Sequence, residues 1–216
     1  MQEHFQMAKG SFGVCQSCGA RKGKAAMFGH LQDCLSTRVS VGSRGGPEAL
    51  LLLRAEARGL PTFWLDIVVK RDGKLKDLDR LLRRTWVECC GHLSEFSTGT
   101  HRKVSMNTKV SEALGPGDRL GYVYDFGSST ELVVRLLGDL TAPLKGAVTL
   151  AARNEAPTWP CDACRKAATA VCPQCLYEGK GFCCATHATD HDCGEDILLP
   201  VVNSPRMGVC GYTGEA

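Results

Sequence analysis

The sequence lacks any apolar run of the roughly 18 residues that a membrane-spanning helix requires. Its first residues, MQEHFQMAKGSFG, also lack the apolar segment of a secretory leader. We therefore expect a cytoplasmic protein that does not enter a membrane. Disulfides need an oxidising compartment, so the 13 cysteines are better explained by metal binding than by covalent bridges.

Signatures of catalysis are also scarce. The Asp-Phe-Gly triplet at 125–127 occurs in protein kinases too, but a glycine-rich phosphate loop, a strand lysine and a catalytic-loop motif are all missing here. Cys89 or Cys90 would need to meet His92 in space to act as nucleophile and base, and a third orienting group is not evident. The sequence thus predicts a turn at the triplet and a protein that is not an enzyme.

Cysteine is what the chain has in abundance, above all between 161 and 193, where it reads CDACRKAATAVCPQCLYEGKGFCCATHATDHDC. The stretch divides into four ligand pairs with the short spacing of zinc knuckles. Pairing the first with the third and the second with the fourth predicts a cross-brace, and sequential pairing is the alternative. The cross-brace gives two ligand sets: Cys161, Cys164, Cys184 and His187; and Cys172, Cys175, His191 and Cys193.

Both sets contain three cysteines and one histidine. Such a closed set leaves no coordination position for an activated water, so the expected zinc is structural rather than catalytic. Cys183 adjoins a ligand and is an alternative to Cys184. Cys210, in the C-terminal tail, is interpreted as a buried thiol in preference to a spare ligand, because eight ligands already satisfy two ions.

A third set lies near the N-terminus, in CQSCGARKGKAAMFGHLQDC at 15–34. A Cys-x2-Cys knuckle precedes a helical stretch on which a histidine and a cysteine, four residues apart, share one face. Gly19 suits the tight turn after the knuckle, and Met27 with Leu31 would form an apolar patch behind the metal. The predicted ligands are Cys15, Cys18, His30 and Cys34, which brings the expected count to three zinc ions.

Charge is unevenly distributed along the chain. Residues 1–46 carry six Lys/Arg against two Asp/Glu, whereas residues 156–216 carry four against seven. The N-terminal end therefore tolerates a phosphate backbone that the C-terminal end repels. Arg21, Lys22 and Lys24 precede the finger helix, where they would meet DNA or RNA or simply form a solvated loop.

The central part has no metal pattern and must supply the main core. Apolar positions from Leu75 to Trp86 recur at helical spacing, which predicts one main amphipathic helix. Strands are expected before and after it, at 49–60, 63–70, 92–97, 103–106, 119–125, 131–138 and 146–154, with a short helical turn at 109–114. This order indicates an α+β fold with a mixed or antiparallel sheet, flanked by two small zinc modules.

This central part resembles the plasmid pRiA4b ORF-3-like family. The segments that carry the resemblance are FWLDIVV, LKDLDRLLRRTWVECCGHLSEF and RLGYVYDFGSSTELVV. Ser128, Thr130 and Leu132 depart from the Asp, Trp and His of the family's YDFGDSWEH motif. Some members also carry an N-terminal finger and a tail like LLPVVNSPRMGVCGYTG. The resemblance implies a link to mobile elements, with which members of that family are associated, and implies no particular activity.

Together these features divide the chain into three parts. They are a finger with a linker (1–46), an α+β domain (47–155) and a two-zinc module with an extended tail (156–216). The Gly- and Ser-rich composition of the linker runs over 35–47. Ile197 to Val202 are apolar enough to pack on the zinc module or the central sheet. We expect a non-enzymatic, zinc-binding adaptor for an unknown protein partner. The alternative is a nucleic-acid-binding factor that uses the basic finger.

Overall fold

The computed structural model describes residues 11–37, 46–100 and 102–214. They fall into two compact units. The larger unit comprises residues 8–83 and 93–155, and therefore contains both the finger and the central stretch. The described residues of the smaller unit are 84–92 and 156–214.

The larger unit is organised around a nine-stranded sheet in the order β2-β1-β9-β4-β3-β8-β7-β5-β6. Every pairing between its strands is antiparallel. The strands are β1 (Phe12–Cys15), β2 (Arg21–Gly23), β3 (Glu48–Ala57), β4 (Leu60–Lys70), β5 (Ser94–Thr98), β6 (Lys103–Val104), β7 (Arg119–Tyr124), β8 (Thr130–Ala142) and β9 (Val148–Asn154). The α+β expectation is confirmed, with a large antiparallel sheet and a few helices.

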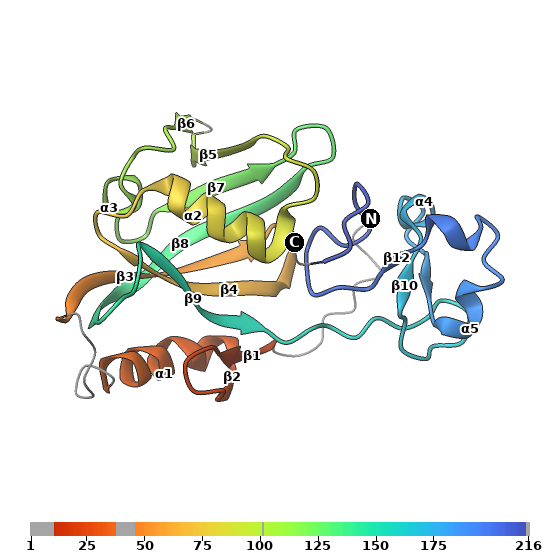
Figure 1. Cartoon of the computed structure of the whole chain (residues 1–216), viewed down its shortest axis with the longest axis horizontal. Coiled ribbons are helices and arrows are strands. Elements are labelled where there is room, and N and C mark those ends of the chain that lie inside the picture. Colours follow the sequence, from red (N-terminus) through yellow and green to blue (C-terminus); the bar gives the residue numbers. More distant parts are fainter. Residues whose placement is uncertain (1–10, 38–45, 101, 215–216) are drawn as a thin grey trace. The chain divides into compact units, whose positions relative to one another are not determined.

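Both faces of the central strands are covered. Helix α1 (Lys24–Thr37) and helix α2 (Leu75–Leu82) lie on opposite sides of β3 and β4 (Figure 1). Successive residues of a strand point to opposite faces. The four consecutive leucines at 50–53 are therefore all buried, two on each side. A run without polar alternation is the expected signature of a strand that solvent reaches from neither face.

Helix α2 confirms the amphipathic pattern, with Leu75, Leu78, Leu81 and Leu82 buried. The Asp77 carboxylate accepts a hydrogen bond from the Lys74 backbone N–H at the helix start, where a negative charge is favourable. The expected helix extended to Trp86, but the α-helix ends at Leu82 and a π-helical turn, η2 (Arg83–Val87), follows. A short helix α3 (Val110–Ala113) occupies the predicted helical turn.

The sheet face that α1 covers changes from apolar to charged along β3. Arg54 donates two hydrogen bonds to Asp66, at 2.6 and 2.7 Å, and both side chains are buried. Beside them Glu56 accepts from Arg135 at 2.7 Å and pairs with Lys24 at 3.3 Å. Burial raises the pKa of Asp66, and the Arg54 guanidinium opposes that rise. Lys24 thus fastens the start of α1 to the sheet.

The smaller unit contains a three-stranded antiparallel sheet in the order β11-β10-β12. Its elements are β10 (Ala170–Val171), α4 (Pro173–Leu176), β11 (Phe182–Cys183), α5 (Ala185–Ala188), the 3-10 turn η3 (Glu195–Ile197) and β12 (Leu199–Pro200). The tail was expected to be extended and to pack on the zinc module or the central sheet. Part of it forms the strand β12, which pairs with β10 of the smaller unit.

Three further expectations concern segments between elements. The 125–127 triplet lies in the turn between β7 and β8, where Asp125 adopts a φ of 65° and accepts a hydrogen bond from the Gly127 N–H at 2.9 Å. The expected linker at 35–47 begins inside α1, and its residues 38–45 lie outside the described part. Among the described residues, no helix is both long enough and apolar enough to cross a membrane.

Candidate metal centres

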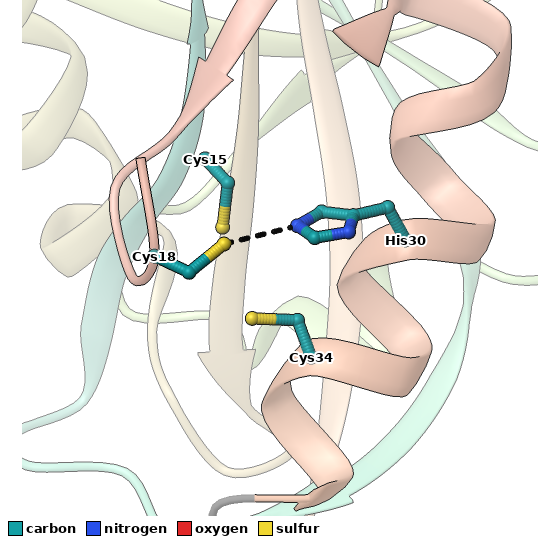
Figure 2. Close-up of side chains that lie close together, drawn as sticks. All are labelled: Cys15, Cys18, His30 and Cys34. Carbon is teal, nitrogen blue, oxygen red and sulfur yellow. Dashed lines mark hydrogen bonds between the residues drawn. The ribbon is translucent and has the colours of Figure 1, made fainter. Parts of the chain in front are cut away.

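The N-terminal group brings its four predicted ligands together. Cys15 and Cys18 come from the knuckle between β1 and β2, and His30 and Cys34 come from α1; the four side chains point toward one another (Figure 2). Their ligand atoms all lie within 4.8 Å of each other, and the Cys18 Sγ is 3.4 Å from the His30 Nε2. The spacing-based assignment therefore corresponds to a real cluster.

The sequence of α1 explains this geometry. Positions 27, 30, 31 and 34 fall on one helical face, because they follow the i, i+3, i+4, i+7 pattern. Met27 and Leu31 are fully buried and belong to one apolar cluster with Cys15 and with Leu50, Leu52 and Trp64 of the sheet. The same face therefore presents two ligands to the knuckle and two apolar side chains to the sheet.

Two of the knuckles share one backbone geometry. In the first, the Cys15 N–H donates to the Ala20 carbonyl at 3.0 Å, and the Gly19 N–H donates to the Cys15 carbonyl at 2.9 Å. In the second, the Cys161 N–H donates to the Lys166 carbonyl and the Arg165 N–H to the Cys161 carbonyl. The residue four places after the first cysteine has a positive φ in both, 75° at Gly19 and 65° at Arg165. The turn predicted at Gly19 is confirmed.

The cysteine-rich stretch forms two groups in space. One contains Cys161, Cys164, Cys184 and His187, and the other contains Cys172, Cys175, His191 and Cys193. Thus the first ligand pair meets the third, and the second meets the fourth. Short helices place the later ligand of two pairs: α4 follows Cys172 and carries Cys175, and α5 follows Cys184 and carries His187.

Asp162 holds the first knuckle against the third pair. Its carboxylate accepts from the Gly181 N–H at 2.6 Å and from the Phe182 N–H at 2.8 Å, while its own N–H donates to the Phe182 carbonyl. The Phe182 ring stacks on Trp159, with centroids 5.0 Å apart. These contacts join two stretches about 20 residues apart without help from a ligand side chain.

The spacing within the groups suits a tetrahedral zinc ion. With Zn–S bonds of about 2.3 Å, two thiolates on one ion lie about 3.8 Å apart, and a thiolate lies about 3.5 Å from an imidazole nitrogen. The Sγ–Sγ distances are 3.6 Å for Cys164–Cys184 and 3.7 Å for Cys175–Cys193. The Sγ–N distances are 3.4 Å for Cys161–His187 and 3.5 Å for Cys175–His191. All three predicted groups can hold a metal ion such as zinc.

The thiols of the two C-terminal groups differ in acidity. Burial raises the pKa of Cys161, but backbone N–H donors and His187 outweigh it and bring the pKa down to about 6. Burial, hydrogen bonding to Cys172 and Cys193, and their negative charge raise the pKa of Cys175 to about 12. Once one thiolate has formed, its charge therefore opposes ionisation of its neighbours. A dication removes that opposition, so metal binding should release protons.

A fourth group of the same composition was missed by the spacing argument. Cys89, Cys90 and His92 meet Cys210, with all four ligand atoms within 4.8 Å of each other. The prediction that Cys210 is a buried thiol is wrong: it is exposed and lies in this group. Cys90 and His92 do meet in space, but within a four-ligand set. Of the 13 cysteines, all within the described residues, Cys183 alone lies outside the four groups, so it does not replace Cys184.

The basic residues of the finger are partly engaged within the chain. Arg21 pairs with Glu155 at 2.6 Å, and its guanidinium lies 3.8 Å from the centroid of the Phe12 ring. Lys24 donates to the Pro61 carbonyl at 2.8 Å in addition to its pair with Glu56. Lys22 is exposed on β2. A phosphate would therefore compete with carboxylates of the same chain for Arg21 and Lys24.

Comparison with known proteins identifies few relatives. No family model matches the chain, and no curated protein matches it either. Among solved structures, the chain is similar to a protein of unknown function from Methanosarcina mazei Go1, with 23% sequence identity and a TM-score of 0.41. That similarity covers 47% of this chain and 68% of the other. The resemblance to the plasmid pRiA4b ORF-3-like family stays a prediction.

Proposed function

We propose that this chain is a non-enzymatic zinc-binding protein that serves as a protein-interaction module or adaptor. The observation that carries the proposal is that each predicted group provides four ligands, three thiols and one imidazole, within 4.8 Å. Four protein ligands complete a tetrahedral site and leave no position for a reacting water. Zinc then stabilises the fold and does not perform chemistry. The three predicted ions comprise one in the finger and two in a C-terminal cross-brace.

The surface of the smaller unit supports a protein partner. Tyr177, beside α4, is 80% exposed. The charged neighbours of the second C-terminal group are mostly acidic and exposed, namely Glu178, Asp190, Asp192, Glu195 and Asp196. Tyrosine is enriched at protein interfaces and often dominates their binding energy. An exposed tyrosine among carboxylates fits a basic protein surface and disfavours nucleic acid.

Binding can be tested by isolating the zinc-loaded full chain from its native cells with a cross-linker and then measuring the affinity of each recovered protein in purified form. Tyr177→Ala should weaken the specific complex at least tenfold. Leu93→Ala is a matched control, because Leu93 is 75% exposed but lies in the larger unit. Equal affinity of both variants for every recovered protein would overturn the proposed surface, and a purified protein with less than one zinc per chain would overturn the metal assignment.

The nucleic-acid alternative depends on Arg21, Lys22 and Lys24 and has a separate test. Fluorescence anisotropy of labelled duplex and single strands at rising salt would reveal an electrostatic contact. Lys22→Glu should abolish such binding, whereas Lys76→Glu, an exposed lysine on α2 of the same unit, should not. Binding that both variants retain would exclude the finger as the contact. The family resemblance adds the proposal that the protein accompanies mobile elements.

A further inference from the structure

The group formed by Cys89, Cys90, His92 and Cys210 has the composition of the three predicted centres. All four residues belong to the smaller unit. The Cys90 Sγ lies 3.8 Å from the Cys210 Sγ and 3.5 Å from the Cys89 Sγ, and the His92 Nε2 lies 3.3 Å from the Cys210 Sγ. The Cys90–His92 distance, 2.9 Å, is shorter than the corresponding distances in the other groups. The arrangement therefore brings three sulfur atoms and one imidazole nitrogen within 4.8 Å of one another.

Other contacts hold the two contributing segments together. The Ser204 hydroxyl donates to the Trp86 carbonyl at 2.5 Å and accepts from the Arg206 N–H at 2.9 Å. Ser204, Arg206 and Trp86 are all buried. The juxtaposition of the tail with residues 84–92, 118 residues away, thus depends on a buried hydrogen-bonded seam as well as on the cysteines. This seam distinguishes the group from a chance meeting of surface thiols.

The backbone at the group is strained in a way that aims its ligands. Cys210 has a φ of 52°, in the left-handed region that L side chains rarely adopt. Gly91, between Cys90 and His92, has a φ of 78°, which glycine adopts readily. Strain of this kind is typical of functional sites, where the surrounding structure maintains it. A metal–thiolate bond would supply that constraint at Cys210.

A buried positive charge adjoins the group. Arg206 is 0% exposed, and its guanidinium donates to the Cys89 Sγ at 3.4 Å. Zinc bound by three thiolates and a neutral imidazole carries a net charge of about −1, so zinc binding would place a negative charge beside this guanidinium.

We propose that Cys89, Cys90, His92 and Cys210 bind a fourth zinc ion, which fastens the C-terminal tail to residues 84–92. Zinc displaces the three thiol protons to solvent, and the ion then forms three bonds to sulfur and one to the His92 Nε2. Residues 84–92 follow α2 and lead directly into β5 of the larger unit. The ion would therefore join the tail to the segment that connects α2 to β5 along the chain.

Metal analysis of the pure full chain tests the count. We expect four zinc ions per chain, falling to three in Cys210→Ser, a change at an exposed position near the chain end that should leave folding intact. Cys183→Ala, which removes the cysteine outside all four groups, should retain four. A wild-type content of three that Cys210→Ser leaves unchanged would overturn the fourth site while leaving the three-ion proposal in place.

Thiol reactivity gives an answer that does not depend on a variant folding. Cys90 and Cys210 are exposed, so burial does not protect them from an alkylating reagent. In the zinc-loaded protein they should stay unmodified and react only after a chelator is added, as shown by mass spectrometry of the peptides. Modification of both before chelation would overturn the site. So would a disulfide between any two of the three cysteines, detected as the loss of two hydrogens per bridge in the unreduced mass.

Discussion

The N-terminal centre and the two C-terminal centres each have three cysteines and one histidine, but these ligands lie in different surroundings. In the N-terminal centre, Cys15 is buried in an apolar cluster with Met27, Leu31 and the side chains of a nine-stranded sheet. In the C-terminal unit, the ligands Cys161, Cys172 and Cys184 are themselves a large part of what is buried. The comparison indicates that a set of three cysteines and one histidine can have two structural roles. It can attach a helix to an existing apolar core, or it can form most of the buried interior itself.

Magnitudes support this distinction. A structural zinc ion contributes about 10–16 kcal/mol to the folding of small zinc modules, whereas burying one Met or Leu side chain contributes about 1.5–3 kcal/mol. With zinc bound, helix α1 would have both kinds of stabilisation, since Met27 and Leu31 are fully buried. In the cysteine-rich stretch, residues 156–193, the buried side chains besides the ligands are Ala168, Val171 and Cys183, all of them small. Its fold should therefore depend on metal far more than the finger does.

The sharpest test of the comparison is Cys172→Ser. The two C-terminal groups alternate along the chain, so loss of one ligand should release both ions and unfold residues 156–214. Metal analysis should show three ions fewer, because Cys210 of the fourth group lies in the same residues. Limited proteolysis should remove this region while the larger unit survives. Cys183→Ala is the matched control and should keep both ions. Loss of one ion with residues 156–214 still resistant would show that the two sites form independently.

Cys34→Ser should have a smaller effect. We expect the finger to lose its single ion while α1 stays against the sheet through its apolar face, so that far-ultraviolet circular dichroism changes little and the melting temperature falls. Ser36→Ala, at an exposed position of the same helix, should alter neither metal content nor melting. Complete unfolding of the larger unit by Cys34→Ser would mean that the finger, like the C-terminal centres, depends wholly on its metal.

Gly13→Ala should weaken the attachment of the finger without touching a ligand. A Cβ at Gly13 would lie 2.5 Å from the Trp64 ring and 2.6 Å from the Arg153 carbonyl, while the Trp64 Nε1 donates to the Ser11 hydroxyl at 2.9 Å. Overpacking of this kind costs about 1–3 kcal/mol. Gly23→Ala is the control, because nothing lies within 4 Å of its Cβ position. Chemical denaturation measures the stability of both variants. Equal denaturation midpoints would contradict the close approach of β1 to the Trp64 ring.

Local patterns in the sequence predicted the ligands and most of the elements. Short spacings between Cys and His identified the members of three groups, and apolar runs bounded by turns identified the strands, because both depend on residues close together in the chain. The pairing of β1 with β9 joins Gly13 to Asn154, and no local pattern carries that information. The finger's place in the main sheet was therefore not expected.

The fourth group was missed for the same reason. Cys89, Cys90 and His92 form three-quarters of a ligand set without the spacing of a knuckle, and Cys210 lies more than 100 residues away. The available signal was an incomplete set at 89–92 together with an unassigned cysteine in the tail. The three residues at 89–92 lacked a fourth ligand, and Cys210 was the cysteine in the tail that could complete their set.

The smallest expected effect comes from a change in the knuckle turn, which has the same backbone geometry in the finger and in the first C-terminal group. Gly19 and Arg165 occupy equivalent positions, with φ of 75° and 65°. Arg165→Gly removes a left-handed strain of about 1–2 kcal/mol and adds about 0.5–1 kcal/mol of unfolded-chain entropy. It should therefore strengthen zinc retention slightly, by less than about tenfold in a chelator competition. Lys166→Gly is the control, because Lys166 is adjacent but has no positive φ. This change adds only the conformational entropy of the unfolded chain, so it should weaken zinc retention. Equal weakening of zinc retention by both changes would mean that Arg165 is not strained.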